Sequence, residues 1–251
     1  MRKFLVAALV LCAVVFTGSK AEAIVDVEAR YWFTNLDANA KFTADSVVGT
    51  QFDLVDDLGI DDKKGFLEGR ITLELGSSKL RYGYVPMKWS GSKTLTQSIV
   101  FAGTTYTAST QVDSELKIDY HRLGYEYDFI DALNNKLGVI FEVKYFDGSA
   151  SLKADSLGFN KTESFKAPIP TVGIAAQVGL PFLFSVGGEV TGMTYGSSAY
   201  ILDAEAGVNI KPMPFVLVSA GYRVFKLHVE QSDDMAEIKL KGPFVTLKAD
   251  F

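Results

Sequence analysis

The sequence contains one cysteine, Cys12, and only two histidines, His121 and His228, among its 251 residues. Cys12 lies in a segment that we expect to be removed, so the mature chain has no thiol. We therefore predict no disulfide, no cysteine-based metal site, no cysteine nucleophile and no cofactor.

Clusters of basic residues are also absent. The 25 lysines and arginines are outnumbered by 30 aspartates and glutamates, which gives a formal net charge of −5. No stretch of the sequence concentrates lysine and arginine. We therefore expect no nucleic-acid partner, because binding to phosphates needs a basic patch.

A further absence is that of a membrane-spanning helix. Two basic residues precede the apolar run at residues 4–16, which is shorter than the roughly 20 residues that a spanning helix needs. Small residues around Ala23 complete the pattern of a cleavable signal peptide. We divide the chain into a signal peptide, residues 1–23, and one domain, residues 24–251.

The uncharged stretch at residues 167–188 does not predict a helix either. It contains Pro168, Pro170 and Pro181, and a proline in a helix interior costs about 3 kcal/mol. The residues on both sides of Pro181 alternate between larger and smaller side chains. Two strands joined by a tight turn fit this pattern better.

Alternation with a period of two dominates the rest of the chain. At the end, Val245, Leu247 and Phe251 alternate with polar residues, as expected of a strand with one face toward lipid and the other toward a polar interior. The pattern predicts an all-β fold, a transmembrane antiparallel up-and-down β-barrel of about ten strands, with eight or twelve as alternatives. The clearest strands are predicted at residues 24–34, 66–75, 112–129, 136–146, 169–178, 182–193 and 200–210.

One predicted strand changes phase. Leu116, Ile118 and Tyr120 share one parity, whereas Leu123 and the apolar residues after it have the other. Taking the apolar residues as outward-facing throughout, we predict a one-residue β-bulge at His121-Arg122.

The connections are predicted to alternate between short periplasmic turns and long extracellular loops, which places both chain ends in the periplasm. The last strand is then expected to pair with the first, at residues 24–34, and so to close the barrel. The predicted long loops are residues 35–65, 90–111, 147–167 and 230–239. Aromatic residues near strand ends, Trp32 and Trp89 among them, are predicted to form girdles at the membrane surfaces.

The segments at residues 112–129 and 242–251 resemble those of the small monomeric outer-membrane β-barrels of Gram-negative bacteria, the broad class that includes the OmpA-barrel and OmpX types. This resemblance implies an outer-membrane location and a monomeric barrel surrounded by lipid and lipopolysaccharide. It also implies that Phe251 serves as an insertion signal for the barrel-assembly machinery. The resemblance transfers no catalytic residue.

Many charged residues occupy the positions predicted to face the barrel interior. In a narrow barrel they are expected to pair with one another, since an unpaired buried charge is costly. The predicted charge network comprises Asp26, Glu28, Arg30, Glu68, Arg70, Glu74, Arg81, Lys117, Arg122, Glu126, Glu142, Lys144, Glu189, Asp203, Glu205 and Arg223. A rigid plugged barrel is the first interpretation, and a thin cation-preferring pore is the second.

Asp119 and His121 form the one pair with the spacing of a catalytic dyad, because residues two apart on a strand point the same way. Omptin proteases use such a pair together with two further aspartates, for which this sequence has no equivalent. Lipid A deacylases use a serine and a histidine, but His228 has no evident serine partner. We expect no catalytic residue, with Asp119 and His121 as the candidates for an outer-membrane hydrolase.

A group of aspartates lies in the first predicted loop. Asp56, Asp57, Asp61 and Asp62 offer the oxygen ligands that Ca²⁺ prefers, but their spacing matches no EF-hand. A solvated acidic loop is expected, with no metal. The leading hypothesis is a non-enzymatic outer-membrane barrel with a structural or surface-interaction role, followed by a narrow porin-like channel and then by a hydrolase.

Overall fold

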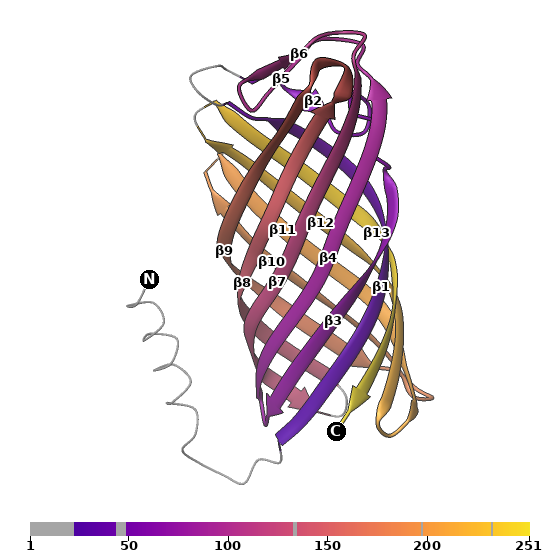
Figure 1. The fold of residues 1–251 in the computed structure, drawn as a ribbon. Helices are drawn as coiled ribbons and strands as arrows, with labels where there is room; N and C mark the ends of the chain where they lie inside the picture. The colour runs from indigo at the N-terminus through magenta and orange to yellow at the C-terminus, as the bar shows by residue number, and fades with distance from the viewer. Residues whose placement is uncertain (1–22, 44–48, 133–134, 197, 232) are drawn as a thin grey trace.

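The computed structural model describes residues 23–43, 49–132, 135–196, 198–231 and 233–251. It is a closed antiparallel β-barrel of ten strands, and each barrel strand pairs with the next barrel strand along the chain (Figure 1). The predicted fold class is confirmed. The predicted signal peptide lies almost wholly outside the described residues.

The barrel strands are β1 (Ala23–Lys41), β3 (Lys63–Leu75), β4 (Ser78–Thr94), β7 (Gln111–Ala132), β8 (Asn135–Ala154), β9 (Phe159–Gly179), β10 (Phe184–Tyr195), β11 (Ala199–Met213), β12 (Val216–Gln231) and β13 (Asp234–Asp250). The remaining elements are β2 (Phe52–Asp53), β5 (Ile99–Phe101), β6 (Thr104–Tyr106) and the 3₁₀ helix η2 (Asp155–Leu157). In the described part of the chain, no helix has the length and apolar character needed to cross a membrane.

The last strand closes the barrel against the first. Val27 lies opposite Ala249, and the register continues to Lys41 opposite Met235. The backbone groups of Val25 and Phe251 exchange two hydrogen bonds of 2.9 Å. The predicted closing seam is therefore confirmed, and the strand ends in a paired aromatic residue rather than a frayed tail.

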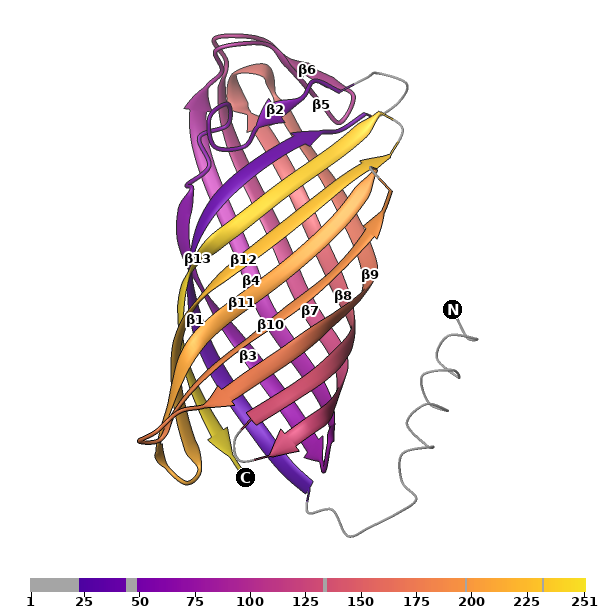
Figure 2. The ribbon, with the colours of Figure 1, turned by 180° about the vertical axis from the view of Figure 1, so that it is seen from behind.

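The two ends of the barrel differ. Elements β2, β5 and β6 gather over one end, which we call the cap end, whereas β1 starts and β13 finishes at the other, the turn end (Figure 2). Short turns, such as Gly76-Ser77 between β3 and β4, connect the strands at the turn end.

The barrel strands extend further toward the cap end than the sequence analysis predicts. β8 and β9 pair up to Ala154 opposite Phe159, and β12 and β13 pair up to Gln231 opposite Asp234. Most of the residues in the loops predicted at 147–167 and 230–239 thus belong to strands, with η2 between β8 and β9. The outward-facing residues of these extensions are mostly polar. A search for strands with an apolar outer face therefore does not detect them.

The predicted bulge at His121-Arg122 is wrong. β7 and β8 keep one register from Asp113 opposite Lys153 to Asp128 opposite Gly138, and a shift occurs only between Asp128 and Ile130. Tyr120 is therefore an inward residue, 2% exposed, while Leu123 faces outward and is 55% exposed.

The change of parity along β7 instead marks the level at which the apolar side chains move from one face of the wall to the other. Toward the turn end, the outer face is apolar and the interior is charged. Toward the cap end, the outer face is polar and the interior is apolar. We call the apolar outer zone the belt; it includes Val27, Ile71, Leu123, Val143, Val172, Ile174, Val190, Val208, Val245 and Leu247, all at least 36% exposed.

The same inversion places both tryptophans inside the barrel. Trp32 is 1% exposed and Trp89 is 0% exposed, so neither belongs to the predicted girdles. Trp89 packs edge-to-face on Phe66, with ring centroids 4.8 Å apart. Both lie in an apolar core that fills the cap half of the barrel together with Val85, Leu116, Ile118, Phe146 and Leu240.

Trp89→Ala is expected to lower the free energy of unfolding by about 3–5 kcal/mol, because it leaves a cavity in this core. The matched control is Phe141→Ala, which removes an aromatic ring from the outer face, where Phe141 is 56% exposed. Urea titration of the folded protein in detergent measures both. A larger loss for Phe141→Ala would contradict the inward placement of Trp89.

Candidate functional site

A layer of ion pairs crosses the barrel interior between the apolar core and the turn end. We call it the charged layer; its members are Glu28, Arg30, Glu68, Arg70, Lys79, Arg81, Arg122, Glu126, Asp128, Glu142, Lys144, Glu189, Asp203, Glu205 and Arg223. Alternation brings them together, because every second residue of each strand faces inward.

Arg223 links two carboxylates at the boundary with the core. Its Nε and Nη2 each donate to Asp203 at 2.8 Å, and its Nη1 donates to Glu68 at 2.9 Å. The guanidinium also lies over the Trp32 ring, 4.6 Å from its centroid. Arg223 is fully buried, so these partners replace all the water that it would otherwise bind.

Glu205 is shared by two arginines from the opposite wall. Arg30 donates to both carboxylate oxygens at 2.6 and 2.8 Å, and Arg70 donates to them at 3.3 and 3.0 Å. Such two-pronged pairs need the planar fork of arginine, which lysine lacks. They join β1 and β3 to β11 across the interior.

Glu189 on β10 forms ion pairs with arginines of β4 and β7. It accepts from Arg122 at 2.7 Å and from Arg81, and Arg122 also donates to Glu142 at 3.0 Å. β4, β7, β8 and β10 are thereby connected through side chains that are far apart in the sequence.

Two residues of the layer are absent from the prediction from sequence. Lys79 contacts Glu126 and Asp128, each at 2.7 Å. Lys79 has the parity of Arg81, and Asp128 has the parity of Glu126, so alternation assigns both to the inner face, although the predicted network omits them. Extending the alternation to the ends of β4 and β7 would have found them.

Lys144 and Tyr120 connect the layer to the core. The Lys144 ammonium lies 2.8 Å from Asp203 and 3.0 Å from the hydroxyl of Tyr120. Tyr120 is stacked on Phe146, with centroids 4.6 Å apart. The sequence identified Lys144 but placed Tyr120 outside.

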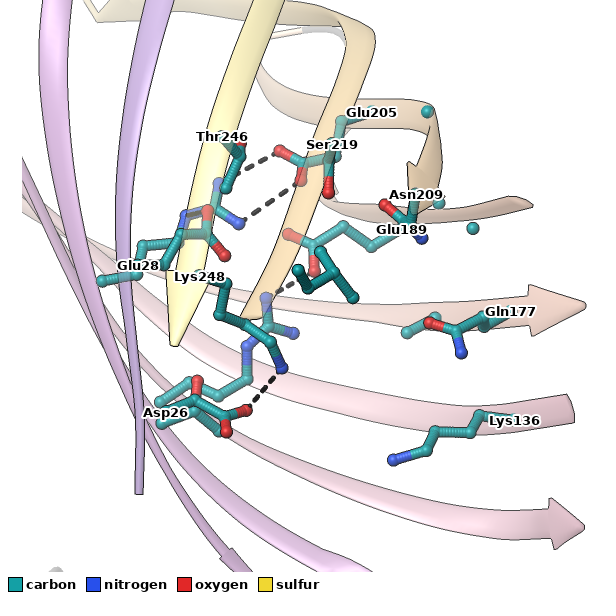
Figure 3. A pocket seen from close by; sticks show the side chains of 18 of the residues that line it. Asp26, Glu28, Lys136, Gln177, Glu189, Glu205, Asn209, Ser219, Thr246 and Lys248 are labelled. Carbon is teal, nitrogen blue, oxygen red and sulfur yellow. Dashed lines mark hydrogen bonds and ion pairs between the residues drawn. The ribbon is translucent and has the colours of Figure 1, made fainter. Parts of the chain in front are cut away.

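Below the charged layer, a polar cavity of about 220 Å³ faces the turn end (Figure 3). At its mouth Lys248 donates to Asp26 at 2.7 Å. Glu74, which lies opposite Ile24 and so nearer the turn end than Asp26, is 3.8 Å from Lys136. Asp26 and Glu74 thus face the interior as predicted by alternation, but as part of this cavity rather than of the layer.

Three residues of the predicted site lie on the outer surface. Lys117 is half exposed and pairs with Glu115 at 2.7 Å, so it is not part of the interior network. Asp119 accepts from the Tyr84 hydroxyl at 2.7 Å, and His121 Nδ1 lies 2.8 Å from the Tyr82 hydroxyl. Asp119 and His121 thus hydrogen-bond to separate tyrosines.

The aspartates of the first loop shape a turn near the cap. Asp57 accepts from the backbone N–H of Asp53 at 2.9 Å, and Asp62 accepts from the Asn35 amide at 3.2 Å. Asp56 and Asp61 are exposed. Within the described ranges, no group of three or more histidine, cysteine, aspartate or glutamate side chains is arranged to hold a metal ion.

The cap closes the apolar end of the interior. Phe52, Ile99 and Phe101 are at most 3% exposed and extend the barrel core. The Tyr106 hydroxyl donates to the carbonyl of Leu152 at 2.9 Å, which ties β6 to β8. Burial raises the pKa of Tyr106, so this hydroxyl remains a donor at neutral pH.

Two solved structures show the same architecture. The outer-membrane protease OmpT of Escherichia coli aligns with a TM-score of 0.50 and 11% identity, over 94% of this chain and 99% of OmpT. The translocator domain of the autotransporter NalP of Neisseria meningitidis aligns with a TM-score of 0.50 and 11% identity, over 97% and 93% of the two chains. No protein-family model matches the sequence, and no curated protein matches it significantly. The chain therefore has the fold of an outer-membrane β-barrel.

Arg223→Met is expected to destabilise the protein by about 3–5 kcal/mol, because Asp203 and Glu68 lose a buried partner. Lys166→Met is the control: it breaks an exposed pair with Asp147 and is expected to cost less than about 1 kcal/mol. Chemical unfolding of both variants in detergent provides the comparison. Equal losses would mean that water screens the charged layer as it screens the surface pair.

Proposed function

We propose that this chain is a plugged outer-membrane barrel with a structural and surface-interaction role, and that its cap is the interacting surface. One observation carries the proposal: two successive layers fill the barrel interior. An ion moving along the axis would have to displace first the charged layer and then the apolar core.

The tight pairing of the charged layer supports a rigid scaffold rather than a pore. Arg223, Lys144 and Glu68 are each at most 1% exposed. A pore lined with charge keeps those charges hydrated, whereas here carboxylates and guanidinium groups satisfy each other. The enclosed ion pairs lock opposite walls together, so the cap rests on a stiff support.

The composition of the cap favours a neutral, hydrogen-bonding partner. Residues 95–110 contain no charged side chain. Thr96, Ser98, Thr105, Thr107 and Ser109 are exposed, while Ile99, Phe101 and Tyr106 are buried in the core. Exposed hydroxyl and amide groups on a fixed ribbon suit the hydroxyl groups of a surface polysaccharide.

The belt supports a location in a bilayer, with lipid and lipopolysaccharide as surroundings. Lys88 and Lys117 lie on the outer face on the cap side of the belt, and Glu115 lies 2.7 Å from each. Tyr84 and His121 lie between them and the belt, stacked with ring centroids 4.7 Å apart. Aromatic rings and then charges are the order expected at a membrane surface. We place the cap outside the cell and both barrel termini in the periplasm, as a single copy inserted by the barrel-assembly machinery.

We propose no enzymatic activity. Asp119 and His121 each hydrogen-bond to a different tyrosine on the outer surface, an arrangement that lacks a shared substrate pocket. Activity on a peptide or on lipid A that disappears in His121→Ala would contradict this part of the proposal.

Cysteine labelling tests the orientation. In a Cys12→Ala background, Ala108→Cys on the cap is expected to react with a membrane-impermeant maleimide on intact cells. Ser77→Cys, exposed in a turn at the opposite end, is expected to react only after the outer membrane is permeabilised. Labelling in the reverse order would overturn the orientation.

Planar-bilayer recording tests the plug. The purified barrel is expected to insert without reproducible conductance steps, because the charged layer and the core block the axis. A porin reconstituted in the same membrane is the positive control, and heat-modifiable gel migration verifies that the inserted protein is folded. Stable, uniform conductance steps from the folded barrel would favour the narrow-channel alternative.

A further inference from the structure

The wall of the barrel is incomplete between β9 and β10. The two strands pair from Ser185 opposite Gly179 to Gly192 opposite Val172, and there the pairing stops. β9 nevertheless continues to Phe159, and it pairs with β8 from Gln177 to Phe159. Among the described residues, β9 thus has one strand neighbour instead of two over residues 159–171.

Two prolines explain why the seam opens at this point. The Leu180 N–H donates to the carbonyl of Phe184 across the seam at 2.8 Å. Backbone groups of residues two apart in a strand point to the same side, so the nitrogens of Pro168 and Pro170 also face the β10 side. Proline has no N–H to donate, and in sheets it occurs at strand edges. The ladder ends directly before the first position, Pro170, that cannot extend it.

A cleft of about 640 Å³ lies where the strands separate. Its lining combines outward and inward residues: Pro170, Val172, Gly192, Thr194, Tyr200 and Leu202 from the outer face, and Thr171, Met193 and Ile201 from the inner face. Ile201 and Thr171 are each 3% exposed. The cleft therefore reaches from the outer surface to side chains of the interior.

The apolar surface continues above the cleft. Phe165 and Ile169 on β9, with Leu227 on β12 and Ile238 on β13, pack against the apolar core but remain only partly buried. A smaller cavity of about 60 Å³ beside them is lined by Ile169, Met193, Leu227 and Val229. Inward apolar side chains of the core half are thus only partly covered next to the open edge of β9.

The lining selects an apolar occupant. Neither cavity is lined by an aspartate, glutamate, lysine or arginine. The outer rim continues the belt through Val172 and Leu202, and Tyr200 stacks on His228 on the cap side, with ring centroids 5.4 Å apart. A chain entering from the belt meets mainly apolar side chains, with Thr171 and Thr194 but no charged group among them. A polar head would remain beside the Tyr200–His228 pair.

We propose that the open seam between β9 and β10 binds an acyl chain of a membrane lipid, which enters sideways from the bilayer and reaches the inner face of the wall. The inference rests on the proposed membrane location of the belt. Continuity between the belt and the cleft identifies the occupant, since the molecules that contact Val172 and Leu202 in a membrane are lipid chains.

Photo-crosslinking in vesicles tests the site. The folded chain is reconstituted with phosphatidylcholine carrying a diazirine near the end of one acyl chain, and the crosslinked residues are mapped by mass spectrometry. Crosslinks are expected at the inward residues Met193 and Ile201 in addition to the belt residues Val245 and Leu247.

A reversible disulfide crosslink between β9 and β10, which we call a staple, provides the matched comparison. In a Cys12→Ala background, Pro170→Cys with Thr194→Cys places two cysteines opposite each other where the register would continue. The oxidised staple is expected to reduce crosslinking at Met193 and Ile201 about tenfold, as expected when even two methylene groups of the chain are excluded. Reduction of the disulfide is expected to restore it. The control staple, Val178→Cys with Val186→Cys, joins residues that are already paired and is expected to change nothing.

The outcomes separate this site from the membrane location. Crosslinks confined to outward residues, with Val245 and Leu247 labelled normally, would overturn the lateral site and leave the proposed location intact. An absence of crosslinks from Val245 and Leu247 as well would overturn both. If the control staple reduced crosslinking at Met193 and Ile201 as much as the seam staple does, the seam would not be the route of entry.

Discussion

The need to pair every backbone N–H and C=O group inside an apolar layer is the constraint on which this structure depends. Lipid offers no hydrogen bonds, so a sheet that crosses it must close on itself. The pairing of β1 with β13 meets that demand, down to the backbone exchange between Val25 and Phe251. Once the ladder is closed, alternation assigns each side chain to the outer face or to the interior.

Closure creates an interior whose contents must then be satisfied. In the turn half this interior contains arginines and carboxylates, which pair across the barrel because a lone buried charge is too costly. In the cap half the outer face is polar, and the interior is an apolar core of the usual kind. Arg223, bound to Asp203 and resting on Trp32, joins the two. The open edge at Pro168 and Pro170 is the exception to complete pairing, and it occurs where apolar interior side chains come nearest to the belt.

Alternation along single strands was sufficient to predict the fold, the closing seam and most of the charged layer. It failed where it was combined with the assumption that apolar residues always face outward. That assumption turned the change of parity between Tyr120 and Leu123 into a bulge, and it placed Trp32 and Trp89 in the girdles. It also left Asp119 and His121 in the interior. The register of β7 with β8 is continuous there, so the apolar side chains pass from the inner face to the outer face of the wall without a break in the strand.

The sequence by itself determined the strands, their faces in the belt and the order in which they pair, because these follow from local alternation and chain connectivity. It also contained Pro168 and Pro170, whose missing N–H groups limit pairing wherever they lie. Only the tertiary structure decided which charges meet, since Arg30 and Glu205 are 175 residues apart and their contact depends on strand tilt and register around the closed barrel. The same geometry decided that β10 ends beside these prolines, and so where the wall stays open.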